Sequence, residues 1–229
     1  TFTLEIRKGL QAELPFADKR DFEEAKRGFI AEPPYTKIMA DAGHVAWDMG
    51  SYGWLLAGKD FESIHPSLQR QAVLNMAYGL YEVVPGRIYQ VRGYDLANIS
   101  FIKGDTGWIV FDPLTAQETA RAALAFINEK LGKRPGVGVV YSHSHVDHFG
   151  GVRGVVDEAD VISGKVKVIA PDGFMQAAIE ENVFSGNAMS RRTQYSYAVL
   201  LPRDPHGHAD QSIGKNVASG NVGLIAPNL

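Results

Sequence analysis

The chain has 229 residues, of which 45% are hydrophobic and 21% are charged, and its formal net charge at pH 7 is −3. These values fit one sizeable domain, or one and a half, with a real hydrophobic core. The small net charge and the lack of a Lys/Arg block argue against an extended nucleic-acid or anionic-membrane surface, so we expect no nucleic-acid partner. Because there is no cysteine, disulfides, thiolate metal sites and a cysteine nucleophile are excluded, and every strong metal ligand must be His, Asp or Glu.

The N-terminal part is predicted to be a partly helical extension over residues 1–85. It begins at Thr1 with neither an initiator Met nor a charged-then-apolar signal peptide, so we expect a processed or trimmed chain, and no signal peptide is visible. Residues 18–30 are charged and helix-prone, and residues 35–65 show no clear period.

A second helix is predicted to begin at Pro66 and to close at Pro85-Gly86, because apolar residues within it follow helical spacing: Leu68, Ala72, Val73, Met76 and Leu80. The longest apolar runs of the chain, residues 72–81 and 136–142, are far shorter than the ~20 residues of a membrane-spanning helix. We therefore expect no stable membrane insertion.

From residue 86 onward the pattern predicts one α/β unit. The pattern predicts three consecutive antiparallel strands, followed by a helix over residues 115–132. Thr115 and Glu118 have the spacing of a capping box at the start of this helix. After this helix the pattern predicts one strand, the metal-ligand cluster described next, a further strand and a further helix. The predicted segments are strands over residues 87–93, 98–104, 107–113, 136–142 and 164–171, and a helix over residues 172–184.

The segment "SHSHVDHFGG", residues 142–151, holds three of the seven histidines of the chain. If the preceding strand continues through it, His143 and His145 emerge on one face as a chelating pair, because strand side chains alternate. Asp147 and His148 lie beyond a turn and can point back, so that a second cation could sit beside the first. Imidazole and carboxylate without thiolate suit Zn²⁺, and suit Mn²⁺ or Fe less well. A solvated histidine-rich loop is the alternative interpretation.

This segment resembles the His-x-His-x-Asp-His signature of the metallo-β-lactamase superfamily. Two further stretches, Gln69 to Thr115 and "GNAMSRRTQYSY" from Gly186 to Tyr197, resemble the linear alkylsulfatases, which hydrolyse dodecyl sulfate and related esters. The resemblance covers most of the chain from about Asp21 onward.

The resemblance implies an αββα sandwich and a binuclear zinc hydrolase, with two Zn²⁺ per complete site and a metal-activated water as the nucleophile. By position His143 and His145 match ligands of one zinc, and Asp147 and His148 match ligands of the other. Asp147 is the residue closest to a catalytic role, since it can both ligate and orient the water. Asp112 matches an aspartate that steadies a ligand histidine by accepting its other N–H. On its own, Asp112 would be interpreted as a strand-end turn former.

One departure from the family bears on completeness. In the family the remaining ligands come from the second half of the sandwich, downstream of anything that aligns here, and four ligands cannot close two zinc sites. His206 and His208 imitate a chelating pair, but their proline- and glycine-rich setting favours a surface loop. We therefore expect the chain to hold only the first half of the sandwich, as an N-terminal part over residues 86–229 of the hydrolase domain, and to be inactive alone.

Substrate contacts are less constrained by the sequence. Arg191 and Arg192 are candidates to hold the sulfate, with a solvated helix face as the alternative, and Asn98 with Asp95 could border the pocket. The resemblance further implies detergent degradation, a homodimer in the full-length protein and a periplasmic or secreted location. Two other functions stay open: a hydrolase of the same superfamily acting on a thioester, lactone or phosphodiester, and a non-catalytic metal-binding fragment.

Overall fold

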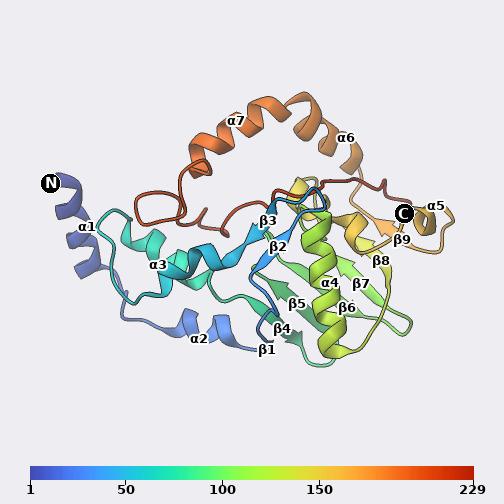
Figure 1. The fold of residues 1–229 in the computed structure, drawn as a ribbon, viewed down its shortest axis with the longest axis horizontal. Coiled ribbons are helices and arrows are strands. Elements are labelled where there is room, and N and C mark those ends of the chain that lie inside the picture. Colours follow the sequence, from blue (N-terminus) through green and yellow to red (C-terminus); the bar gives the residue numbers. More distant parts are fainter.

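The computed structural model describes residues 1–229 and is built around a seven-stranded mixed sheet (Figure 1). Its strands, in spatial order, are β1 (Phe29–Ala31), β4 (Gly79–Val84), β5 (Ile88–Arg92), β6 (Ile99–Lys103), β7 (Trp108–Phe111), β8 (Gly136–Val140) and β9 (Lys167–Ile169). Neighbours from β1 to β7 pair antiparallel, whereas β8 and β9 continue the sheet in parallel. A separate hairpin joins β2 (Lys37–Met39) and β3 (Val45–Asp48).

Seven α-helices and four short irregular helices surround the sheet. The α-helices are α1 (Phe2–Glu13), α2 (Arg20–Lys26), α3 (Pro66–Leu74), α4 (Gln117–Leu131), α5 (Glu158–Ile162), α6 (Phe174–Ile179) and α7 (Gly186–Tyr197). The 3₁₀ segments are η1 (Met49–Leu56), η2 (Val146–His148) and η3 (Val152–Gly154), and η4 (Glu180–Phe184) is a π-helix. None of the helices is both long enough and apolar enough to cross a membrane.

The two faces of the sheet differ in how they are covered. Val91, Phe101 and Val110 alternate onto one face and are fully buried. Helix α4 packs on this face, where Trp108 donates its indole N–H to Asn128 of the helix at 2.9 Å. The opposite face is only half-buried and carries Ile88, Ile102, Ile109 and Phe111. One helix layer on one sheet is the arrangement expected for the first half of an αββα sandwich, as the sequence predicted.

The order of the predicted elements after residue 86 is confirmed, but β8 and β9 are shorter than predicted, the last predicted helix is divided into α6 and η4, and the predicted cap of α4 is absent. Strands β5, β6 and β7 form the antiparallel meander, and α4 and β8 follow as expected. The capping box, however, is wrong: the N-cap residue of α4 is Ala116, and no side chain caps the helix. Thr115 donates its hydroxyl to Asp95 instead, and Glu118 accepts from Asn221, because both polar groups serve contacts with distant segments.

The predicted helix from Pro66 to Pro85 is also wrong in its second half, since α3 ends at Leu74 and β4 begins at Gly79. Gly79 has a φ of +135°, which no helix accepts, and a Cβ there would lie 2.6 Å from the carbonyl oxygen of Ala31. The apolar spacing that suggests a helix reflects β4 being buried between two neighbouring strands. Strands β1 and β4 thus lie in the same sheet as the strands after residue 86, and the division at residues 85/86 stays a prediction.

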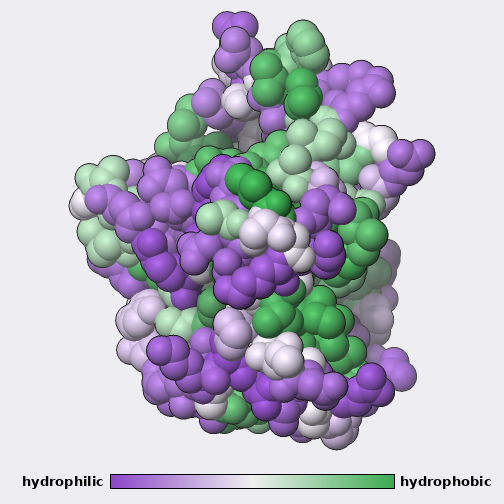
Figure 2. Space-filling view, turned by 90° about the vertical axis from the view of Figure 1, so that its right-hand side faces the viewer, coloured by the Kyte–Doolittle hydropathy of each residue, from purple (hydrophilic) through white to green (hydrophobic).

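Helix α7 projects from the body and has no buried residue. Figure 2 shows this projection at the top of the molecule, with apolar and polar patches side by side on it. Phe184, just before α7, is 82% exposed, so it does not belong to the core.

Candidate metal centre

The parallel pairing of β7 and β8 brings the candidate metal ligands to one edge of the sheet. Asp112 directly follows β7, the histidine cluster follows β8, and the backbone N–H of Asp112 donates to the carbonyl of Val140 at 3.0 Å. In open α/β sheets the region outside the carboxyl ends of the strands is where ligands bind. The sheet therefore places the predicted ligands where a site is expected.

The cluster forms in a different way from the predicted strand extension. Strand β8 ends at Val140, so His143 and His145 lie in the loop that follows and do not share a strand face. The turn η2, in which the N–H of His148 donates to the carbonyl of His145 at 3.0 Å, folds the chain back. The ring centroid of His143 is consequently 4.6 Å from that of His145 and 4.1 Å from that of His148. A turn, and not strand alternation, brings the three imidazoles together.

Asp112 lies at the centre of the hydrogen bonds behind the cluster. Its carboxylate accepts from the backbone N–H and the hydroxyl of Ser142, at 2.8 and 2.7 Å, and contacts Nδ1 of His148 at 2.9 Å. Its φ of +55° lies in the left-handed region, which a residue other than glycine occupies at a cost of order 1–3 kcal/mol. This contact with His148 is the one that the proposed role of Asp112 requires.

Each of the three imidazoles has one ring nitrogen beside an oxygen of a neighbouring side chain. Nδ1 of His148 meets Asp112, Nδ1 of His143 lies 2.9 Å from the hydroxyl of Ser142, and Nε2 of His145 lies 3.5 Å from the carboxylate of Glu181. The other ring nitrogen has no such partner in His143 and His145, whereas Nε2 of His148 lies 3.3 Å from Oδ2 of Asp147. The sequence analysis missed Ser142 and Glu181; the position of Ser142 immediately before the first histidine was a signal for the former, and nothing local marks the latter.

Electrostatics tie His148 to two carboxylates. Burial lowers the pKa of His148, but its contacts with Asp112 and with Asp147 outweigh burial and raise the pKa to about 9. Asp147 Oδ2 lies 3.3 Å from Nε2 of His148; burial works to raise the pKa of this aspartate, and the neighbouring histidine brings it below its usual value. For His143, burial and the two neighbouring histidines lower the pKa. A histidine must lose its proton to ligate a metal, so metal binding would release the proton that His148 holds at neutral pH.

The donor set fits zinc in chemistry but does not enclose it. Imidazole nitrogens and a carboxylate, with no thiolate, are ligands that Zn²⁺ accepts. No group of three or more such side chains is arranged to hold an ion as it stands. That four ligands leave two zinc sites incomplete therefore stays a prediction.

The sequence model of the Metallo-beta-lactamase superfamily matches residues 92–226, a span that contains Asp112 and the whole cluster. The chain belongs to this superfamily. It is 50% identical to an (R)-specific secondary-alkylsulfatase of Pseudomonas sp over 94% of its length, and 44% identical to the alkyl/aryl-sulfatase BDS1 of Saccharomyces cerevisiae over 99%. The chain spans about a third of these relatives, 32% and 35% of their lengths.

Among solved structures, the chain is similar to the inverting sec-alkylsulfatase Pisa1 from Pseudomonas sp, with a TM-score of 0.94 and 48% identity. That match covers all of this chain and 36% of Pisa1. The predicted superfamily, the metallo-β-lactamase fold and the likeness to alkylsulfatases over an N-terminal part are thus confirmed.

Within this superfamily fold, two glycines allow the histidine loop to pack closely against the turn between β7 and α4. A Cβ on Gly150 would lie 2.3 Å from the carbonyl oxygen of Thr115, and one on Gly151 would lie 2.1 Å from that of Pro113. The N–H of Gly151 also donates to the carbonyl of Leu114 at 2.8 Å. The loop with the histidines and the turn with Asp112 are therefore held together backbone to backbone.

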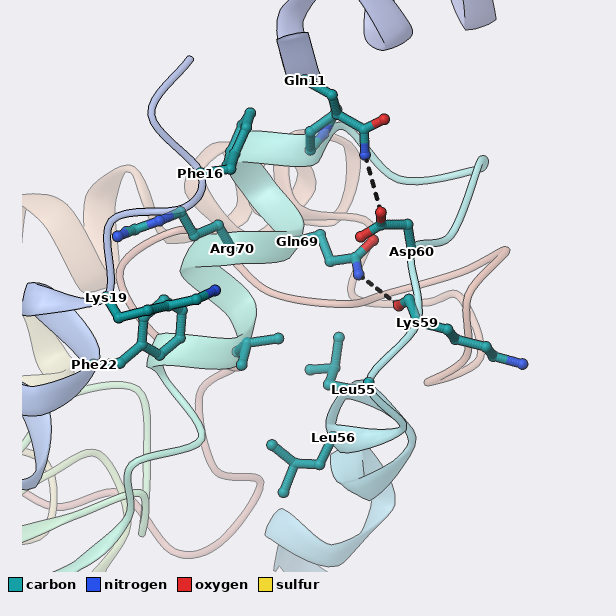
Figure 3. A pocket seen from close by; sticks show the side chains of 13 residues that line it. Gln11, Phe16, Lys19, Phe22, Leu55, Leu56, Lys59, Asp60, Gln69 and Arg70 are labelled. Carbon is teal, nitrogen blue, oxygen red and sulfur yellow. Dashed lines mark hydrogen bonds between the residues drawn. The ribbon is translucent and has the colours of Figure 1, made fainter.

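The main cavities lie away from the metallo-β-lactamase cluster. One cavity, of about 630 Å³, lies between the N-terminal helices, α3 and η1, and Gln11 donates to Asp60 beside it at 3.3 Å. Figure 3 shows this pocket, with Lys19 reaching across Phe22. Neither this cavity nor four smaller ones of about 260 to 370 Å³ is lined by a histidine of the cluster. Within the cluster His143 and His145 are exposed, whereas the side chains of Asp147 and His148 are only 16% and 23% exposed.

The candidate substrate-binding residues lie in two separate parts of the structure. Arg191 and Arg192 are exposed on α7, and Asn98 is an exposed residue that lines a cavity of about 260 Å³ together with Asp95. The carboxylate of Asp95 is committed to Thr115, Thr119 and Ala218, so its role is structural.

The surface-loop interpretation holds for His206, which is exposed, and is wrong for His208, which is only 2% exposed. The ring of His208 packs on Tyr52, with Nδ1 at 3.0 Å from the hydroxyl, because the loop folds back over η1.

Asp112→Asn tests whether the contact between Asp112 and His148 supports metal binding. The amide keeps the size of the side chain but loses the charge that faces His148, so we expect metal affinity to fall by about 10- to 100-fold. Competition with a chelator measures the affinity. Asp105→Asn, in the exposed turn between β6 and β7, is the matched control and should bind metal as the wild type does. Wild-type affinity in Asp112→Asn would return Asp112 to the role of a turn former.

Proposed function

We propose that the protein containing this chain hydrolyses alkyl sulfate esters to an alcohol and inorganic sulfate, with zinc as its metal. The observation that carries this proposal is the cluster of imidazoles backed by Asp112, in a chain about half identical to alkylsulfatases. Superfamily membership supports metal-dependent hydrolysis, and the relatives support the sulfate ester as the substrate class.

The roles of the residues are proposed from the family resemblance, and their contacts support them. His143 and His145 would hold one ion, and Asp147 with His148 would hold a second ion beside it. A bound zinc would supply Lewis acidity, which lowers the pKa of water toward neutrality and polarises the sulfate ester. Asp112 fixes His148 through Nδ1, so that Nε2 stays directed toward Asp147. Asp147 would also orient the attacking water, because an ionised carboxylate accepts a hydrogen bond from it.

Sulfate recognition needs local cations or N–H donors, since the net charge of −3 attracts no anion from a distance. Arg191 and Arg192 are proposed to supply that charge from α7, whose surface is free of core contacts. Asn98 is proposed to border the substrate pocket. We further propose a homodimer and a periplasmic or secreted location, on the ground of the family resemblance alone.

An alkyl-sulfate series tests the substrate. A sulfate monoester has the same head group at every chain length, so differences along the series report burial of the tail, worth about 0.8 kcal/mol per CH₂. We expect the full-length protein to release sulfate from medium-chain primary alkyl sulfates near neutral pH, with kcat/KM rising a few-fold per added methylene. Sulfate release is measured at equal concentrations of each ester.

A panel of other esters is the control for this series. A flat response to chain length would contradict burial of the tail. Rapid turnover of a thioester, lactone or phosphodiester with none of dodecyl sulfate would favour another hydrolase of the superfamily. Metal content with no turnover of any ester would favour a non-catalytic metal-binding role.

A further inference from the structure

Glu181 makes a contact that the proposed function does not use. Its carboxylate is 25% exposed and lies 3.5 Å from Nε2 of His145, whose own side chain is 59% exposed. Glu181 belongs to η4, the single π-turn that continues α6, and turns of this kind occur frequently at functional sites. A partly buried carboxylate from a separate helix thus meets an exposed imidazole of the cluster.

The position of Glu181 is fixed by the way α6 is anchored. Phe174, at the start of α6, is 4% exposed and stacks on Tyr141 with ring centroids 5.1 Å apart. It also meets Phe149 edge to face at 5.5 Å. Tyr141 directly precedes the histidine loop and Phe149 directly follows the cluster, so α6 is docked on both ends of the loop that Glu181 touches.

The neighbours of Glu181 are occupied within their own helix. Glu180 accepts a hydrogen bond from Gln176 at 2.8 Å, and Asn182 donates to the carbonyl of Ala178 at 2.9 Å. Only Glu181 among these polar side chains reaches across to the loop. The contact is therefore specific to this position and is not a general property of an acidic helix end.

We propose that Glu181 is a positioning residue for His145: it accepts Nε2–H and so presents Nδ1 of this ring to the ion. A metal-bound histidine almost always gives its other N–H to a carboxylate, a carbonyl or water, which fixes the tautomer and the ring orientation. Asp112 does this for His148 and Ser142 contacts Nδ1 of His143, so Glu181 completes the set with one partner for each imidazole. This inference rests on the proposed metal-dependent function and deepens it.

The test compares Glu181→Ala with Glu181→Gln in the full-length protein. The glutamine amide oxygen can still accept Nε2–H, whereas alanine offers no partner. We expect Glu181→Ala to weaken Zn²⁺ affinity by about 10- to 100-fold and Glu181→Gln to recover most of it. Chelator competition gives the affinity. Glu180→Gln, one residue earlier on the same turn, should match the wild type.

A second readout follows the ring itself. The ¹⁵N chemical shifts of His145 in the metal-free protein report which nitrogen carries the proton. We expect the Nε2–H form in the wild type and in Glu181→Gln, and a mixture of the two tautomers in Glu181→Ala. A carboxylate that only supports the fold would change thermal unfolding and leave this ratio unaltered.

Two results would overturn the inference: wild-type affinity and tautomer ratio in Glu181→Ala, or equal loss in both variants with an altered Co²⁺ absorption spectrum, which would make Glu181 a direct ligand. Failure of the proposed function is separate from either. If the variants behave as expected and the wild type releases no sulfate from any alkyl ester, the substrate proposal fails and the role of Glu181 stands.

Discussion

His148→Ala is expected to abolish sulfate release by the full-length protein while leaving its fold in place. The substitution removes a proposed ligand and also leaves Asp112 and Asp147 without the imidazole that lies between them, at 2.9 and 3.3 Å. We expect metal affinity and activity to fall by more than the roughly 10- to 100-fold that is typical when a residue hydrogen-bonded to a ligand is removed. Sulfate release measures the activity, thermal unfolding the fold, and elemental analysis the loss of metal that we also expect.

His206→Ala is the matched control, because His206 is exposed and lies on a loop outside the cluster. It should retain both metal and rate. Retention of metal and activity in His148→Ala would remove this residue from the site and with it the interpretation of the Asp147–His148 pair.

Asp95→Ala is expected to cause the largest loss of stability. Asp95 is 3% exposed and its carboxylate accepts from Leu96, Thr115, Thr119 and Ala218, at 2.8 to 3.1 Å. Burial raises its pKa and these donors act to lower it. Each buried donor left without an acceptor costs about 1–3 kcal/mol, and Asp95→Ala leaves several such donors, so we expect a loss of several kcal/mol.

Urea unfolding of the full-length protein gives the change in the free energy of unfolding. Asp105→Ala, at an exposed turn, is the control and should fall within about 0.5 kcal/mol of the wild type. A cost below about 1 kcal/mol for Asp95→Ala would show that water replaces the carboxylate as the acceptor.

Elements formed by local pattern were predictable from the sequence, and those decided by distant partners were not. Helix α4 follows from apolar periodicity, and the meander from short β-type runs between turn residues. The position of Leu80 fits a helix that begins at Pro66 and fits a strand equally well. Only the pairing of β4 with β1 and β5 decides in favour of the strand. Thr115 and Glu118 match a capping box in sequence, but both side chains bind segments far along the chain.

The same distinction applies to the metal centre. The donor residues were predictable because they lie within six consecutive positions, whereas their arrangement depends on the turn η2. Glu181 lies 36 residues after His145, and its approach depends on the docking of Phe174 against Tyr141 and Phe149. No periodicity in the sequence records such a contact.

Gly150 and Gly151 have a structural role, in contrast to the chemical role of the histidines before them. The histidines offer donor atoms, whereas the glycines allow two carbonyl groups to approach where any side chain would collide. A descendant of this protein that lost its metals could replace the donors without cost to its backbone, yet it would still need both glycines. In a search of genomes, the glycines therefore mark the fold, and the histidines mark the chemistry.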